Sequence, residues 1–157
     1  MTKKILVPLD GSELAECSLA HIRDLAKSNL VGEVTLLRVV QLNFPPWMNG
    51  YGEKFDINSI RANAFAQYQH YLNGVKDRLS AEGIKVKTDI IENLGITKMN
   101  ITEAILEYAK QNGHDLIVVA THGDSGLKRV YLGSVAMGIL NHSNVPVYLI
   151  RPEACKN

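Results

Sequence analysis

The sequence predicts an α/β protein, a single doubly wound sandwich in which a five-stranded parallel sheet has helices on both faces. Three observations support this. Short apolar runs alternate with longer helical patterns, the helical patterns repeat apolar residues every three or four positions, and 157 residues is close to the length of one domain. We therefore treat residues 1–157 as one domain.

Five short apolar runs are the predicted strands, and they span residues 5–9, 34–40, 86–91, 116–120 and 145–150. The first and fourth are almost unbroken, as expected for strands covered on both faces. The third alternates with Lys87 and Asp89, which indicates an edge strand. Pro146 in the fifth run also indicates an edge, because proline cannot donate to a strand ladder. Right-handed crossovers then favour the strand order 3-2-1-4-5.

Three helices are predicted from apolar residues at helical spacing. These residues are Ala15, Leu19, Ile22 and Ala26, then Ile60, Ala64, Tyr68, Tyr71, Val75 and Leu79, and then Ile101, Ile105, Tyr108 and Ala109. Asn100 followed by Glu103 has the pattern of a capping box at the start of the third helix. Gly83 and Gly113 lie where the second and third helices should end.

The strand order predicts where a ligand would bind. The winding direction reverses between the first and fourth strands, and ligands of open α/β sheets bind at such a reversal, beyond the carboxyl ends of the strands. The two strand ends are residues 8–11 (PLDG) and 120–123 (ATHG). We expect these two segments to face each other across a crevice.

Charge and cysteine content limit the function classes. The chain has 17 Lys+Arg against 16 Asp+Glu, a net charge of +1, so no broad basic field attracts nucleic acid or an anionic membrane. No apolar run approaches the roughly 20 residues that cross a bilayer, and residues 1–4 lead into the first strand without a signal-peptide core. Cys17 and Cys155 have no metal-binding spacing and are few for a secreted domain, so we expect a cytoplasmic protein.

Residues 41–58 fit no predicted element. They include Pro45 and Pro46 followed by Trp47, with Gly50 and Gly52 further on. An irregular stretch of this length in a compact domain is usually functional or disordered. Two interpretations stay open: a segment that covers the crevice or meets a partner, and ordinary irregular packing.

The segment 120–134 (ATHGDSGLKRVYLGS) has the residues of a phosphate cradle. Gly133 and Ser134 open a last helix predicted over residues 135–140, and the unpaired amides at a helix start favour an anion. Gly123 and Gly126 can adopt positive φ and build a concave array of N–H groups. The alternative is purely structural, because glycines commonly end strands and Ser134 can cap a helix. The chain lacks GxxxxGK[ST], and it lacks GxGxxG after the first strand.

This segment resembles the nucleotide-binding signature of the universal stress protein family, G-x2-G-x9-G-[S/T]. Gly123 matches the second glycine, and nine residues separate it from Gly133 and Ser134. Residues 5–12 (ILVPLDGS) and 145–150 (VPVYLI) resemble the same family, so the likeness covers nearly the whole chain.

Two positions depart from the family pattern. Ala120 replaces the first glycine of the signature and adds only a methyl group. Asp124 stands where many members have a basic residue. An acid beside phosphates is unfavourable unless it turns outward or reaches a metal.

The resemblance implies that the chain binds an adenine nucleotide, which is ATP or else ADP or AMP. By position, Asp10 would contact the ribose or a metal-bound water, and the alternative is a cap or turn residue after the first strand. The backbone of Val39 would contact adenine, and the alternative is an ordinary core valine. The implied binding residues are Pro8, Leu9, Asp10, Val39, Ala120, His122, Gly123, Gly126, Arg129, Gly133, Ser134 and Val135. Lys128 and Arg129 either help to bind the phosphates or lie on a solvated face. Mg²⁺ or Mn²⁺ would be recruited through the phosphates, because the chain offers no all-protein cage.

Three functions are compatible with these residues. An ATP-binding regulatory module of the stress response is favoured, because a phosphate cradle is present without recognisable hydrolytic machinery. A slow ATP hydrolase or nucleotide α-hydrolase would need His122, Asp124 or Asp10 to align water, whereas His122 is otherwise a hydrogen-bonded structural histidine. The third is a nucleotide-free interaction protein with the same fold. We name no catalytic residue and no metal-binding side chain.

The predicted fifth strand has an apolar edge that invites pairing. The resemblance implies a homodimer joined through this strand. We also expect a downstream protein partner for a regulatory module, without a sequence feature that identifies it.

Overall fold

The computed structural model describes residues 2–41, 56–93, 100–123, 130–131 and 133–151. In chain order the elements are β1 (Lys3–Pro8), α1 (Glu13–Glu16), α2 (Ser18–Lys27), β2 (Val31–Gln41), α3 (Ile57–Ala81), β3 (Val86–Asn93), α4 (Ile101–Gln111), β4 (Leu116–Ala120), β5 (His122–Gly123), β6 (Val130–Tyr131), α5 (Ser134–His142) and β7 (Val147–Ile150). Five strands form a parallel sheet in the order β3-β2-β1-β4-β7. This confirms the predicted order 3-2-1-4-5, with β7 as the fifth strand.

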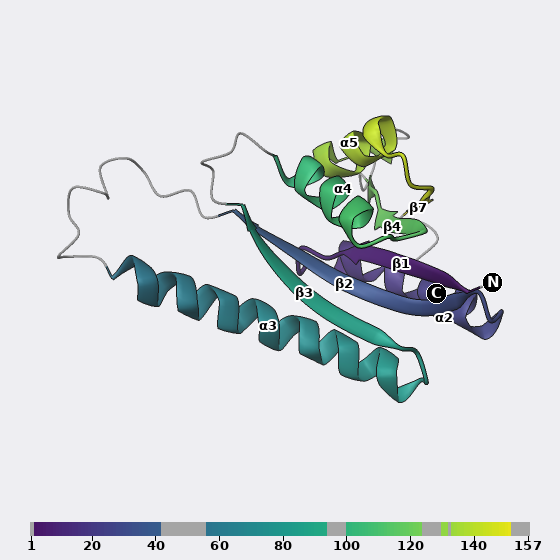
Figure 1. Ribbon diagram of the computed structural model, residues 1–157, viewed down its shortest axis with the longest axis horizontal. Helices are drawn as coiled ribbons and strands as arrows, with labels where there is room; N and C mark the ends of the chain where they lie inside the picture. The colour runs from purple at the N-terminus through teal and green to yellow at the C-terminus, as the bar shows by residue number, and fades with distance from the viewer. Residues whose placement is uncertain (1, 42–55, 94–99, 124–129, 132, 152–157) are drawn as a thin grey trace.

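The sheet lies between two layers of helices, with α2 and α3 on one face and α4 and α5 on the other (Figure 1). Successive residues of β1 point to opposite faces. Ile5 and Val7 therefore join the apolar cluster beneath α2 and α3, whereas Leu6 joins the cluster beneath α4 and α5. This double coverage explains why the first strand is an unbroken apolar run.

The predicted helix signals are confirmed. Asn100 Oδ1 accepts from the Glu103 amide at 2.9 Å, and Glu103 Oε2 accepts from the Asn100 amide at 3.0 Å, which is a complete capping box. Gly83 and Gly113 follow α3 and α4 with φ of +81° and +63°. The Gly83 amide donates to the Ser80 carbonyl, as in a Schellman motif.

Several element boundaries differ from the prediction. The first helical pattern forms two helices interrupted at Cys17, where the Ser18 hydroxyl donates to the Ala15 carbonyl at 2.6 Å. A serine that bonds backward in this way competes with regular helix bonding. Pro146 lies directly before β7, and its carbonyl accepts from Ile117 at 2.9 Å. Helix α3 begins at Ile57, and residues 42–55 of the irregular stretch lie outside the described residues.

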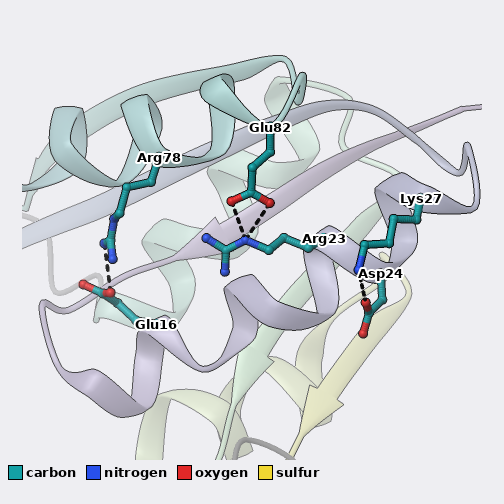
Figure 2. A network of polar contacts seen from close by, with 6 residues as sticks. All are labelled: Glu16, Arg23, Asp24, Lys27, Arg78 and Glu82. Atoms are coloured by element: carbon teal, nitrogen blue, oxygen red, sulfur yellow. Dashed lines mark hydrogen bonds and ion pairs between the residues drawn. The ribbon is translucent and has the colours of Figure 1, made fainter. Parts of the chain in front are cut away.

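Ion pairs join the first two helices to α3 (Figure 2). Arg78 Nη2 lies 2.9 Å from Glu16 Oε2, and Arg23 Nε lies 2.7 Å from Glu82 Oε1. Such partly exposed pairs contribute at most about 1 kcal/mol each, so they add little to the stability of the fold. Within the part of the chain that the structure describes, no helix has the length and apolar character that a membrane crossing requires.

Candidate nucleotide site

A crevice opens where the sheet order reverses. Strands β1 and β4 pair only at Ile5 with Leu116 and at Leu6 with Ile117, and they separate toward their carboxyl ends. A cavity of about 260 Å³ lies between these ends. Its position agrees with the rule that ligands of open α/β sheets bind at the reversal point.

Eight of the twelve predicted binding residues line this cavity. They are Pro8, Leu9, Asp10, Val39, Ala120, Gly133, Ser134 and Val135. The structure brings them together, and their contact with a ligand stays a prediction. His122 and Gly123 form β5, which pairs with Tyr131 and Val130 of β6 in a short antiparallel ribbon. Gly126 and Arg129, together with Asp124 and Lys128, lie outside the described residues.

The turn after β1 positions Asp10. Gly11 has a φ of +87°, a conformation that a side chain would strain. This turn brings Ser12 back onto Asp10, so that the Ser12 amide and hydroxyl both donate to Oδ1, at 2.9 and 2.6 Å. The Ser12 hydroxyl also accepts from the Ala15 amide at 3.1 Å, at the start of α1. The carboxylate is thus held by its own turn, and Oδ2 has no hydrogen bond among the described residues.

The surroundings of Asp10 favour its ionised form. Partial burial by itself acts to raise the pKa of the Asp10 carboxyl. The hydrogen bonds from the Ser12 hydroxyl and amide, and the positive charge of Arg38, outweigh this effect, so the pKa lies below its ordinary value of 3.8. Asp10 is therefore a fixed acceptor at neutral pH.

The backbone N–H and C=O of Val39 face the cavity and have no hydrogen-bond partner among the described residues, although Val39 lies opposite Ile91 of β3 in the sheet. The β1–β2 ladder ends where the Leu9 amide donates to the Leu37 carbonyl at 2.9 Å, whereas β2 continues to Gln41. Alternate residues of a strand direct their backbone groups to the same side. The N–H and C=O of Val39 therefore point like those of Leu37, toward the space beyond the end of β1.

Helix α5 begins at the opposite wall of the cavity. Gly133 is its N-cap, with φ −56° and ψ 154°, and no side chain caps the helix. The first helical hydrogen bond runs from the Met137 amide to the Gly133 carbonyl at 2.9 Å. The amides of residues 134–136 therefore precede the helical ladder, and the helix dipole gives this end a partial positive charge.

The sequence did not predict a role for Arg38, although it lines the cavity. Its Nη1 lies 3.4 Å from the Leu9 carbonyl oxygen, and its guanidinium lies over the ring of Tyr68. The only sequence signal was a charged residue inside an apolar strand. The apolar wall that Ile101 and Ile105 contribute was also missed, because both were assigned only to helix packing.

A second hollow of about 450 Å³ lies between α4 and α5 and shares Ile101, Ser134 and Val135 with the first. Two of its polar residues, Asn100 and Glu103, already satisfy each other in the capping box. The smaller cavity lies at the reversal point of the sheet and holds eight of the predicted binding residues, so we regard it as the candidate site. Among the residues with described positions, no three His, Cys, Asp or Glu side chains are grouped to hold a metal ion.

Comparisons with known proteins agree with this fold. The sequence model of the Universal stress protein family matches residues 1–151. Universal stress protein MJ0577 of Methanocaldococcus jannaschii is 31% identical over an alignment of 163 positions that covers 96% of each chain, and its solved structure gives a TM-score of 0.73. A family member from Burkholderia pseudomallei gives 0.70 at 26% identity, with 94% of this chain and 95% of that chain covered.

A universal stress protein solved in complex with cAMP shares the fold, with a TM-score of 0.56 at 19% identity over 94% of this chain and 95% of that one. The match of the family model over nearly the whole chain, together with the likeness to MJ0577, establishes the relationship. The chain belongs to the universal stress protein family.

Proposed function

We propose that this protein is a regulatory module that binds an adenine nucleotide (ATP, or ADP or AMP) in the crevice cavity. The observation that carries the proposal is that three chemically different groups meet there. They are the Leu9–Asp10 turn, the unpaired backbone of Val39, and the free amides at the start of α5. These groups suit, respectively, the sugar, the base and the phosphates of a nucleotide.

The nucleoside would lie against the ends of β1 and β2. The edge of adenine carries both donors and acceptors, which the free N–H and C=O of Val39 can complement. Ile101 and Ile105 offer apolar surface to the ring. The ribose hydroxyls would donate to the free Oδ2 of Asp10.

The phosphates would lie toward Gly133, Ser134 and Val135, where helix amides and the helix dipole favour negative charge. The resemblance adds Gly126 and Arg129 to this end. Mg²⁺ or Mn²⁺ would be held mainly by the phosphate oxygens. The cavity, at about 260 Å³, is close to the lower end of the range of about 300–1,000 Å³ for small-ligand sites. It suits a nucleoside whose phosphates extend over the start of α5.

The fold relative solved with cAMP supports the same ligand class, because cAMP is an adenine nucleotide. This support is an analogy of fold alone. The residues around the cavity carry the argument for this chain.

Ser134→Asp tests the phosphate end. An acidic side chain in the first turn of α5 interacts favourably with the helix dipole, so the variant should keep its fold while it repels the phosphates. We expect the dissociation constant for ATP with Mg²⁺ to rise at least about tenfold in calorimetric titration. Asn58→Asp adds the same charge to the first turn of α3, away from the cavity, and should leave binding unchanged. Equal affinity for both variants would refute the placement of the phosphates.

Mass spectrometry of small molecules released from protein purified without added nucleotide tests the ligand class. Adenine nucleotide at near-stoichiometric amount supports the proposal. No released nucleotide, together with millimolar or absent affinity for ATP, would favour the nucleotide-free alternative. ADP formation well beyond one turnover that is lost in His122→Ala would favour the slow hydrolase.

We also propose that the chain forms a homodimer through β7. This strand is an edge of the sheet, and Tyr148 on it is 39% exposed. Exposed strand edges pair readily with a second copy. Sedimentation of the full chain should show a dimer that Tyr148→Lys weakens, and a monomer at high concentration would contradict this. A cytoplasmic location and a downstream protein partner stay predictions.

A further inference from the structure

Arg38 is a charged residue inside an apolar stretch of β2. Its Cζ lies 4.6 Å from the ring centroid of Tyr68 on α3, which is a cation–π contact. Its Nη1 lies 3.4 Å from the carbonyl oxygen of Leu9. The side chain is thereby placed along the wall of the cavity, beside Asp10 and Val39.

The guanidinium of Arg38 has few hydrogen-bond partners among the residues that the structure describes. Its bond to Leu9 is long, its Nε is buried without a partner, and it forms no ion pair with a carboxylate. A guanidinium has five N–H donors, and leaving donors unmet in a half-buried position is costly. Among the described residues Nη2 makes no hydrogen bond, and it is not one of the buried unpaired atoms, so it keeps some exposure and can donate to a further acceptor.

Asp10 offers the complementary group on the same wall. Its Oδ1 is occupied by Ser12, whereas Oδ2 accepts no hydrogen bond from the residues that the structure describes. A hydroxyl is both donor and acceptor. Neighbouring hydroxyls of a sugar can therefore donate to the carboxylate of Asp10 while their oxygens accept from the guanidinium of Arg38.

We propose that Arg38 is a specificity-determining residue which, with Asp10, selects nucleotides whose ribose carries both free hydroxyls. This inference rests on the proposed nucleotide-binding function. An analogue without one hydroxyl leaves a donor or an acceptor of this pair unmet, and sites built around a hydroxyl discriminate strongly against such analogues. If Arg38 instead contacted only phosphates, its loss would weaken the binding of all three nucleotides to the same extent.

The test is calorimetric titration of the full chain with ATP, 2′-deoxyATP and 3′-deoxyATP. The variants are Arg38→Met, Arg38→Lys and the control Arg61→Met. Arg61 also lies over an aromatic ring of α3, with its Cζ 5.9 Å from the Phe65 centroid, but it does not line the cavity. We expect the unmodified chain and Arg61→Met to favour ATP over each of the two deoxy analogues by about tenfold. Arg38→Met should reduce this preference to about twofold or less, and Arg38→Lys should keep part of it.

Two results would overturn the role of Arg38 without affecting the proposed function. The first is no preference for ATP in the unmodified chain, and the second is an equal loss of affinity for all three nucleotides in Arg38→Met. Absence of any nucleotide binding by the unmodified chain would overturn the proposed function together with this inference. Thermal unfolding of each variant checks the fold. If Arg38→Met does not fold, the preference for ATP over the deoxy analogues is compared between the unmodified chain and Arg38→Lys, and an equal preference in both would overturn the role of Arg38.

Discussion

The substitution Gly138→Ala tests how closely α4 and α5 must approach to shape the cavity. A β-carbon added at Gly138 would lie 2.7 Å from both Cγ2 and Oγ1 of Thr102 and 3.2 Å from its Cβ. Thr102 is buried, and rotation about χ1 moves Cγ2 and Oγ1 but leaves Cβ in place. The added methyl group must therefore push α5 away from α4.

The expected magnitude follows from two opposing effects. Replacing glycine with alanine inside a helix stabilises by about 1 kcal/mol through helix propensity. Overpacking a close contact costs about 1–3 kcal/mol, so Gly138→Ala should lower the free energy of unfolding by up to about 2 kcal/mol. Gly74 in α3 is the matched control, because an added β-carbon there meets nothing within 4 Å. Gly74→Ala should stabilise by about 0.5–1 kcal/mol.

Thermal unfolding of the two variants provides the assay. For a chain of 157 residues, each kcal/mol shifts the midpoint by about 2–4 °C. Gly74→Ala should raise the midpoint, whereas Gly138→Ala should leave it unchanged or lower it. Adding Thr102→Ala to Gly138→Ala should recover stability, because the two positions are coupled. Equal stabilisation by both alanines would refute the close contact of the two helices.

Two further predictions concern elements outside the cavity. Burial lowers the pKa of His114 below its ordinary value of 6.5, and the positive charge of Lys4 lowers it further. As the pH falls through 6.5, the unfolded chain therefore binds a proton that the folded chain does not. Stability should therefore decline as the pH falls through 6.5 and below. His114→Gln keeps a polar side chain beside the Thr35 hydroxyl and should remove this part of the decline in urea unfolding. An unchanged dependence of stability on pH would contradict the lowered pKa. Asn100→Ala removes the capping box of α4 and should cost about 1 kcal/mol in the same assay, whereas no loss would mean that the cap is not formed.

The strand order could be predicted from the sequence because the burial of each strand determines the pattern of apolar and polar residues within it. An unbroken run such as residues 5–9 is compatible with a central strand, and the alternation around Lys87 and Asp89 is compatible with an edge. The helix ends could also be predicted from neighbouring residues, because the capping box and the positive φ of Gly83 depend on residues within one turn. These signals need no knowledge of distant contacts.

Features that depend on distant residues could not be predicted. The contact of Arg38 with Tyr68 joins β2 to α3, and no spacing in the sequence determines it. The β5–β6 ribbon has two residues in each strand, which is too short for a period-two pattern. The free backbone of Val39 arises because β1 ends before β2 does. The sequence identified Val39 only through the family resemblance.

The proposed function requires that backbone amides from both walls of the crevice meet the same nucleotide. Amide NMR spectra of the full chain, recorded during titration with ATP and Mg²⁺, test it most directly. We predict that the amide signals of Val39, Ser134 and Val135 shift together along one binding curve, while those of α2 on the far face of the sheet stay in place. Shifts confined to other surfaces, or an unchanged spectrum at millimolar ATP, would contradict the claim.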